Sequence, residues 1–335
     1  MGKRIKIIVA FVYVCTFIQA QTNLEKGLHS INKNTAEACI TFLAGDELEG
    51  REAGTHGANI ASAYLMSEMQ EIGIVPLTNN GYYQMFEACN KERTMRGGRW
   101  QVNTDSINKL KNGIHRSIKM RNVLGMIPGK NKNEYVVIGA HFDHLGVDPT
   151  LEGDQIYNGA DDNASGVSAV IQIAQAFIKS GKEPERNVIF AFWDGEEKGL
   201  LGSKYFVENC SFINQIKAYL NFDMIGRNKD EQKPKHVDFF YTEAYPAFEK
   251  WSKDDIKKYH LQLEPVFRPW DKPIGGSDNG PFAQKGIPIM WYHTDGHRDY
   301  SMPGDHAEKL NWNKIVEITK AAFLNAWKLA NESNY

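Results

Sequence analysis

Short apolar runs of strand length recur along the chain. The clearest is residues 188–193, Val-Ile-Phe-Ala-Phe-Trp, where β-branched and aromatic residues follow one another without a polar break. Such a run is typical of a strand that is buried on both faces of a parallel sheet. Apolar runs of the same kind predict further strands at residues 82–86, 122–127, 135–140, 218–222 and 287–291.

Between these runs, apolar residues recur at three- and four-residue spacing, which is the pattern of a helix with one buried face. The pattern is clearest in residues 312–330, which follow Asn311, a residue type that often caps the start of a helix. The same spacing predicts helices at residues 28–43, 58–72, 165–180, 200–209 and 245–260.

From residue 134 onward, the predicted strands and helices alternate. This order predicts an α/β fold in which helices cover both faces of a twisted, mixed but mostly parallel central sheet. A chain of 335 residues with 42% hydrophobic residues can bury one large core, and no repeat or low-complexity linker marks a boundary. We therefore expect one domain over residues 21–335, with the Lys- and Arg-rich residues 90–121 as an excursion over its surface.

Residues 1–20 have the pattern of a signal peptide, with a basic start, an apolar core over residues 7–18 and the small residue Ala20 before Gln21. We expect cleavage near Ala20 and a secreted or periplasmic mature protein. The apolar core is short for a membrane span, and no later stretch approaches about eighteen uninterrupted apolar residues. The sequence therefore predicts no membrane-spanning segment.

Charge and cysteine content exclude two classes of protein. The net charge of −2 gives no reason to expect a polyanionic partner, so we expect no binding of nucleic acid. After cleavage of the signal peptide three cysteines remain, Cys39, Cys89 and Cys210. Their odd number and wide spacing exclude a disulfide framework, and at most one pair can be bridged.

Three of the predicted strands are followed by side chains that can bind metal ions or transfer protons. These side chains are His141 and Asp143 after the first strand, Glu196 and Glu197 after the second, and Asp223 after the third. The carboxyl ends of parallel strands meet at one edge of a sheet, where open α/β folds place their active sites. Neutral imidazole with several carboxylates is the ligand set of Zn²⁺ in hydrolytic sites. Adjacent side chains point in different directions, so we expect one glutamate to bind metal and the other to transfer protons. Asp143 can accept the second ring N–H of His141.

Four ordered motifs contain these residues. They are His-x-Asp at 141–143, Gly-Ala-Asp-Asp-Asn-Ala-Ser-Gly at 159–166, Asp-Gly-Glu-Glu-x-Gly-Leu-Leu-Gly-Ser at 194–203 and Asn-Phe-Asp-Met-Ile-Gly at 221–226. Together they resemble the motifs of the co-catalytic zinc aminopeptidase family, which includes bacterial leucine aminopeptidases, glutamate carboxypeptidase and, as a divergent branch, glutaminyl cyclase. The resemblance covers nearly all of the mature chain, because residues 45–54 and 276–282 resemble two further family segments.

The resemblance implies a role for each of these residues. His141 and Asp223 would hold one zinc ion, Glu197 would help to hold a second, and Asp162 would bridge the two. Glu196 matches the general base, which takes a proton from the metal-activated water that attacks the scissile carbonyl and passes it to the leaving amine. The implied activity is that of a zinc-dependent exopeptidase that removes N-terminal residues from peptide substrates.

The chain departs from the family pattern at the last ligand. The family places a histidine in a Tyr-His-x-x-x-Asp context after the last core strand, and the matching residues here are Tyr300, Ser301 and Asp305. A serine hydroxyl is a poor zinc ligand at neutral pH. The zinc ion that Asp162 and Glu197 would share therefore lacks one expected ligand.

Three interpretations of Ser301 stay open. In the first, His297 from the same loop takes the missing place, ahead of His293 and His306. In the second, the second metal is weak or absent, and a single zinc ion bound to His141 and its carboxylate partners does the work. In the third, the site has decayed and the chain binds peptides without cleaving them.

Glutaminyl cyclisation is an alternative activity, because one fold can host both chemistries. The cyclase branch shares Asp-Gly-Glu-Glu and uses one zinc ion. That ion needs the histidine that Ser301 replaces, whereas residues 199–203, Gly-Leu-Leu-Gly-Ser, resemble the peptidase branch. The sequence therefore favours the peptidase.

Overall fold

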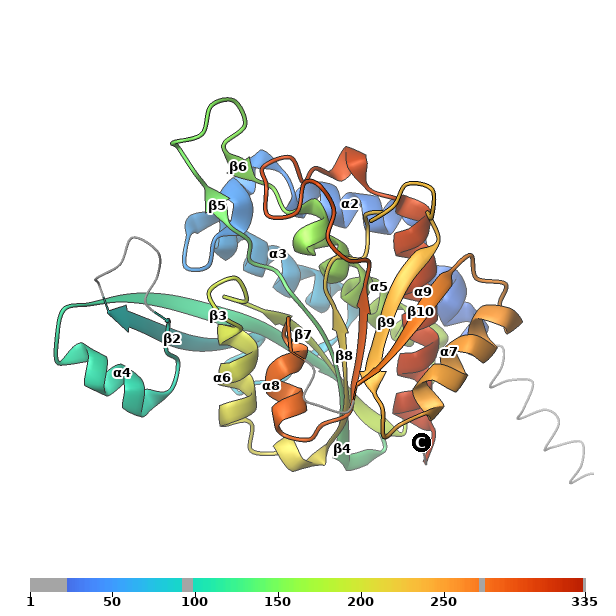
Figure 1. Ribbon diagram of the computed structural model, residues 1–335. Helices are drawn as coiled ribbons and strands as arrows, with labels where there is room; N and C mark the ends of the chain where they lie inside the picture. Colours follow the sequence, from blue (N-terminus) through green and yellow to red (C-terminus); the bar gives the residue numbers. More distant parts are fainter. Residues whose placement is uncertain (1–22, 92–98, 271–274, 334–335) are drawn as a thin grey trace, which may run out of the picture.

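The computed structural model describes residues 23–91, 99–270 and 275–333, and its centre is a mixed sheet of nine strands with helices on both faces (Figure 1). The strand order is β1-β3-β7-β4-β8-β11-β9-β10, with β2 paired to β3. Two short strands, β5 (Gly146–Val147) and β6 (Ile156–Tyr157), pair with each other outside this sheet. The predicted α/β fold with one mixed central sheet is confirmed.

Parallel neighbours form the middle of the sheet. Every residue of its strand β7 is buried, and successive side chains enter opposite cores, with Val188 on one face and Ile189 on the other. This burial on both faces explains why an unbroken apolar run predicted the strand. The four strands are β7 (Arg186–Trp193), β4 (Asn131–His141), β8 (Ile216–Phe222) and β11 (Ile289–His293).

The outer strands run partly against this direction. β3 is antiparallel to β7, and β9 is antiparallel to β11 with β10 parallel beside it. The sequence did not predict β9 or β10, because Asp238 breaks the apolar run of the first and Pro265 and Pro269 stand in the half-exposed second. The outer strands are β1 (Val75–Pro76), β2 (Tyr83–Lys91), β3 (His115–Ile127), β9 (His236–Thr242) and β10 (Glu264–Trp270).

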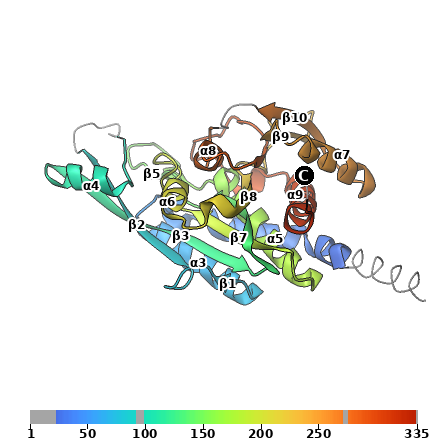
Figure 2. The ribbon, with the colours of Figure 1, turned by 90° about the horizontal axis from the view of Figure 1, so that it is seen from below.

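Helices cover both faces of the sheet (Figures 1 and 2). The larger core lies between the sheet and five helices, whereas two shorter helices contribute Phe206 and Phe282 to the core on the opposite face. The five are α2 (Lys33–Leu43), α3 (His56–Ile72), α5 (Gly166–Ser180), α7 (Ala247–Lys258) and α9 (Trp312–Asn331), and the two are α6 (Leu201–Asn209) and α8 (Asn279–Gln284).

The helix predicted at residues 28–43 is divided in the structure. Residues 23–30 are helical, and α2 begins only at Lys33. Asn32 separates the two segments, because its side chain accepts a hydrogen bond from the backbone N–H of Thr35, 3.0 Å away, and so caps α2. The helical spacing of apolar residues continues across this break, so the sequence pattern predicted one helix instead of two.

The region predicted as a surface excursion, residues 90–121, is described by the structure except for residues 92–98, and its described part contains more regular structure than expected. β2 and β3 pair from Tyr83 with Val123 out to Lys91 with His115, and α4 (Thr104–Lys111) lies at the far end of this arm (Figures 1 and 2). Lys111 of α4 binds Glu87 of β2 with an N–O distance of 2.6 Å. This arm, formed by the outer parts of β2 and β3 together with α4, therefore continues the two strands that the sequence predicted at residues 82–86 and 122–127.

Three sequence predictions concern export, membranes and disulfides. The predicted signal peptide, residues 1–20, lies outside the described residues. Among the described helices, none combines the length and the apolar character that a membrane crossing needs. Cys39, Cys89 and Cys210 are unbridged thiols.

Candidate metal centre

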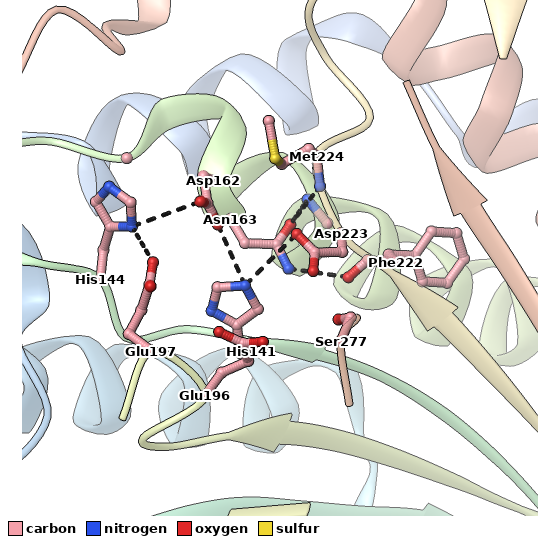
Figure 3. Close-up of polar contacts among 12 residues, drawn as sticks. His141, His144, Asp162, Asn163, Glu196, Glu197, Phe222, Asp223, Met224 and Ser277 are labelled. Atoms are coloured by element: carbon pink, nitrogen blue, oxygen red, sulfur yellow. Dashed lines mark hydrogen bonds and ion pairs between the residues drawn. The ribbon is translucent and has the colours of Figure 1, made fainter. Parts of the chain in front are cut away.

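Predicted ligands from three neighbouring strands meet at one edge of the sheet. His141 is the last residue of β4, Asp223 directly follows β8, and Glu196 and Glu197 stand in the turn after β7. Asp162 reaches the same place from the turn that precedes α5. Figure 3 shows these side chains gathered around His141.

The first group of possible ligands contains His141, Asp162 and Asp223. His141 Nε2 lies 3.2 Å from Asp162 Oδ1 and 3.6 Å from Asp223 Oδ1. The other ring nitrogen, Nδ1, is 3.1 Å from the carbonyl oxygen of Asp143. A carbonyl oxygen only accepts, so this contact places the ring proton on Nδ1 and leaves Nε2 free to bind metal.

A second group shares Asp162 and adds Glu197 and His144. His144 Nδ1 lies 2.8 Å from Glu197 Oε1 and 3.9 Å from Asp162 Oδ2. Asp162 turns one carboxylate oxygen to each histidine, so the two groups share this side chain. The sequence prediction omitted His144, although it stands one residue after the His-x-Asp motif.

Asp143 holds the turn of the two glutamates. Its Oδ1 accepts the backbone N–H of Glu196 at 3.0 Å, and its Oδ2 accepts that of Glu197 at 3.4 Å. Its carboxylate is 3.7 Å from His141 Nδ1, farther than its own carbonyl oxygen. The predicted contact with the ring N–H is therefore made by the backbone of Asp143, and its carboxylate orients the turn instead.

The carboxylates of this cluster are crowded and buried. Burial raises the pKa of Glu197 to about 7, and it also raises the pKa of Asp162 and, most strongly, that of Glu196. Among the described residues, the ion-pair partners of Asp162 and Glu197 are His141 and His144 alone. A divalent cation would offset this burial of negative charge, and imidazoles with carboxylates are donors that zinc prefers. The residues present therefore fit zinc.

Arg51 lies in the segment of residues 45–54 that resembles the family, and its side chain forms hydrogen bonds to two segments that contain metal-binding residues. Its Nε donates to the carbonyl oxygen of Phe142 at 2.8 Å, and its two terminal nitrogens donate to those of Asn158 at 2.7 Å and Gly159 at 3.0 Å. It also donates to the carbonyl oxygen of Leu43. A single side chain therefore holds the residue after His141 and the start of the loop that contains Asp162 in fixed positions relative to each other.

A chain of buried hydrogen bonds ends on Asp223. The indole N–H of Trp193 donates to the Tyr219 hydroxyl at 2.8 Å, which donates to Asn221 at 2.7 Å, whose amide donates to Ser277 at 3.0 Å. An indole N–H can only donate, so the Tyr219 hydroxyl accepts from Trp193 and has its own proton for the amide oxygen of Asn221. Ser277, which accepts from the Asn221 amide, is in turn a hydrogen-bond partner of Asp223. Burial opposes ionisation of Asp223, but hydrogen bonds from His141 and Ser277 lower its pKa.

His297 does not join either group of ligands. Its Nε2 lies 3.3 Å from Oδ2 of Asp161, whose Oδ1 accepts the backbone N–H of Gly226 at 2.5 Å. The loop that contains Ser301 is nevertheless attached to the site, because Asp305 accepts the backbone N–H groups of Asp161 at 2.9 Å and of Asp162 at 3.0 Å. Asp161 therefore shapes the loop, and His297 contacts Asp161.

The other two histidines considered from the sequence also bind elsewhere. His293 Nδ1 is 2.6 Å from the carbonyl oxygen of Asp223. His306 Nε2 is 2.8 Å from Asp154, outside the cluster. Neither stands in the second group of ligands.

Comparison with known sequences gives a family match. The family model described as peptidase family M28 matches residues 122–325. Leupeptin-inactivating enzyme 1 of Streptomyces exfoliatus is 32% identical over 190 residues, which cover 56% of this chain and 38% of the relative. An aminopeptidase of Pseudomonas aeruginosa is 37% identical over 115 residues, 34% of this chain and 19% of the relative. The chain thus spans well under two thirds of the curated relatives that it matches.

Solved structures share the fold. The Legionella pneumophila LapA aminopeptidase superimposes with a TM-score of 0.68 at 20% identity, covering 92% of this chain and 75% of the other. A Bacillus subtilis zinc aminopeptidase gives 0.67 at 14% identity, covering 91% and 97%. A Porphyromonas gingivalis glutaminyl cyclase gives 0.60 at 15% identity, covering 89% and 99%. At these identities the similarity concerns the fold alone.

Proposed function

The chain belongs to peptidase family M28, and from this premise we propose that it is a zinc-dependent aminopeptidase that hydrolyses N-terminal residues from peptides. One observation carries the proposal: two groups of metal-binding side chains share Asp162, while Glu196 stands beside them in neither group. A shared carboxylate places two metal positions side by side, as in two-metal hydrolases such as aminopeptidases.

In this proposal His141, Asp162 and Asp223 would hold zinc in the first group, and Asp162 and Glu197 would hold it in the second. Bound zinc supplies Lewis acidity, which lowers the pKa of water and polarises a carbonyl group. A hydrogen bond from Ser277 helps to lower the pKa of Asp223 and so favours its ionised, metal-binding form. The hydrogen bond from His141 Nδ1 to the backbone keeps Nε2 turned toward the carboxylates.

Glu196 acts as the general base and then as the general acid. Its backbone N–H is fixed by Asp143 at 3.0 Å, so the turn presents its carboxylate at the edge of the cluster. Burial raises its pKa, which brings the carboxylate closer to the basicity that proton transfer near neutral pH requires. It takes a proton from the attacking water and delivers it to the leaving amine.

The test is Glu196→Gln, which keeps the size of the side chain and removes its basicity. We expect kcat on aminoacyl amides to fall by about 10²-fold or more, with zinc content unchanged. Glu208→Gln on the exposed end of α6 is the matched control. Full turnover by Glu196→Gln would refute its role, and no turnover by the wild type on any aminoacyl amide would refute the aminopeptidase.

A peptide with an N-terminal glutamine separates the proposed activity from cyclisation. Hydrolysis releases free glutamine and a peptide shorter by one residue. Cyclisation instead releases ammonia and leaves every residue in place. Mass spectrometry of the products therefore decides between the two reactions, and ammonia without shortening would replace the proposal by the cyclase alternative.

A further inference from the structure

His144 is placed to bind a metal ion together with Glu197 and Asp162. Its ring Nδ1 faces Glu197 Oε1 at 2.8 Å and Asp162 Oδ2 at 3.9 Å, and its side chain is wholly buried (Figure 3). On the basis of the proposed zinc function, we propose that His144 binds the second zinc ion in place of the histidine that the family pattern would put at Ser301. The site then keeps two metals although the expected ligand is absent.

The backbone around His144 holds its ring in this place. The N–H of His144 donates to the carbonyl oxygen of Arg51 at 3.2 Å, and residues 52 and 144 form an isolated β-bridge. On the other side, a Cβ added at Gly159 would lie 2.6 Å and 2.7 Å from two atoms of the imidazole, and 2.2 Å from the carbonyl oxygen of Asp162. The glycine therefore leaves the space that the imidazole occupies, and the ring is oriented before a metal arrives.

The tautomer that coordination requires is accessible. Binding through Nδ1 needs the ring proton on Nε2. Over residues 23–91, 99–270 and 275–333, no hydrogen-bond partner meets Nε2 of His144. In the metal-free chain the carboxylate of Glu197, 2.8 Å from Nδ1, holds the ring proton there. A cation bound at Nδ1 would displace this proton, and Nε2, whose lone pair no donor among the described residues occupies, is the ring atom that can carry it instead.

The other candidates for this position are less suitable. His297 contacts Asp161 at 3.3 Å, and Ser301 offers only a hydroxyl group. With His144, the second group has one imidazole and two carboxylates, and three protein ligands are the number with which catalytic zinc sites keep a position open. Each of the two zinc ions would then have one histidine, and Asp162 would lie between them.

The experiment is a zinc titration of the full chain by calorimetry after removal of metal with a chelator, with metal content measured on the dialysed protein. We expect about two ions per wild-type chain and about one for His144→Ala, with the remaining ion bound as tightly as in the wild type. His144→Asn, which keeps a polar atom near the position of Nδ1, is the second variant and is also expected to lose one ion. Circular dichroism confirms that each variant is folded.

Two further variants locate the effect. Ser301→His in the His144→Ala background should restore the second ion, because an imidazole returns to the position that the family pattern uses. His297→Ala is the matched control, since it removes a buried histidine from the same loop as Ser301 and should keep both ions. A folded His144→Ala that binds two ions, or a wild type that binds one, would overturn the proposal.

Turnover of aminoacyl amides, recorded on the same samples, separates this proposal from the proposed function. Two ions in the wild type and one in His144→Ala, without turnover in any sample, would leave His144 as a ligand and refute the aminopeptidase. Turnover by a wild type that holds a single ion would support the aminopeptidase and refute the role of His144.

Discussion

Arg51 is a charged side chain that is only 1% exposed, and it contributes to the metal centre without contacting the ligands directly. Burial lowers the pKa of its guanidinium to about 10, so it remains protonated at neutral pH. Its N–H groups satisfy carbonyl oxygens on segments far apart in the sequence, including those of Phe142 and Gly159. Buried carbonyl oxygens need such partners because water does not reach them.

Arg51→Met should therefore destabilise the chain. The variant removes a donor from four carbonyl oxygens, of which, among the described residues, only that of Gly159 keeps another, the backbone N–H of Ala164. We expect the free energy of unfolding to fall by about 3 kcal/mol or more. Arg51→Lys keeps the charge but not the planar set of donors, so it should recover only part of this loss. Urea denaturation measures both, with Arg116→Met on the exposed arm as control. A loss no larger than that of the control would contradict the role of Arg51.

At the scale of elements, burial decides which strands the sequence could predict. β7, β4, β8 and β11 are covered on both faces, so each contains an apolar run that stands out from its surroundings. β10 is half exposed and contains Pro265 and Pro269, which made it resemble a loop. Since the metal ligands follow the buried strands, the elements that position the site were among the predictable ones.

The hydrogen-bond chain across β7 and β8 gives a prediction for Tyr219→Phe. Loss of the hydroxyl leaves the indole N–H of Trp193 and the amide oxygen of Asn221 without partners, which should cost about 1–3 kcal/mol of stability. The Asn221 amide is then no longer held in one orientation, so Ser277 loses its fixed direction toward Asp223. We expect zinc affinity to fall by about tenfold, measured by competition with a chelator.

Tyr135→Phe is the control for this variant, because its ring stacks on Phe212 elsewhere on the same sheet and takes no part in the chain. Equal zinc affinity in wild type and Tyr219→Phe would show that the chain stabilises the core without positioning Asp223. A loss of affinity in both tyrosine variants would point to a general effect on the sheet.

At the scale of the whole molecule, the contact between His144 and Glu197 is the part of the site that the sequence did not predict. The four motifs indicated His141, Asp162, Glu197 and Asp223 because each of these residues stands in a recognisable local pattern. His144 approaches Glu197 only when residues distant in sequence pack together, since their separation is 53 positions. No local pattern encodes that approach, and the family resemblance directed the search for the last ligand to the loop of Ser301 instead.

The sum of buried charges predicts how the stability of the metal-free chain depends on pH. Burial raises the pKa of Asp194 to about 8, and that of Glu197, Asp278 and Asp305 to about 7. In the unfolded chain these groups titrate near pH 4, at about their unperturbed values. Between the two values the folded chain holds protons that the unfolded chain has released, so the free energy of unfolding falls as pH rises. His144, whose pKa burial lowers to about 4, acts in the opposite direction only below its ordinary value of 6.5.

From about pH 6.5 to about pH 7.5 the raised carboxyl groups therefore act together, and we expect the Tm of the chelated protein to fall by about 3 °C or more. Zinc should remove or reverse this fall, because a bound cation stabilises the ionised carboxylates and binds more tightly as they lose protons. Thermal melting followed by circular dichroism, in chelator and in excess zinc at both pH values, measures the difference. A chelated protein that is more stable at the higher pH would contradict the buried, protonated cluster. A Tm that zinc leaves unchanged at both pH values would contradict the metal centre itself.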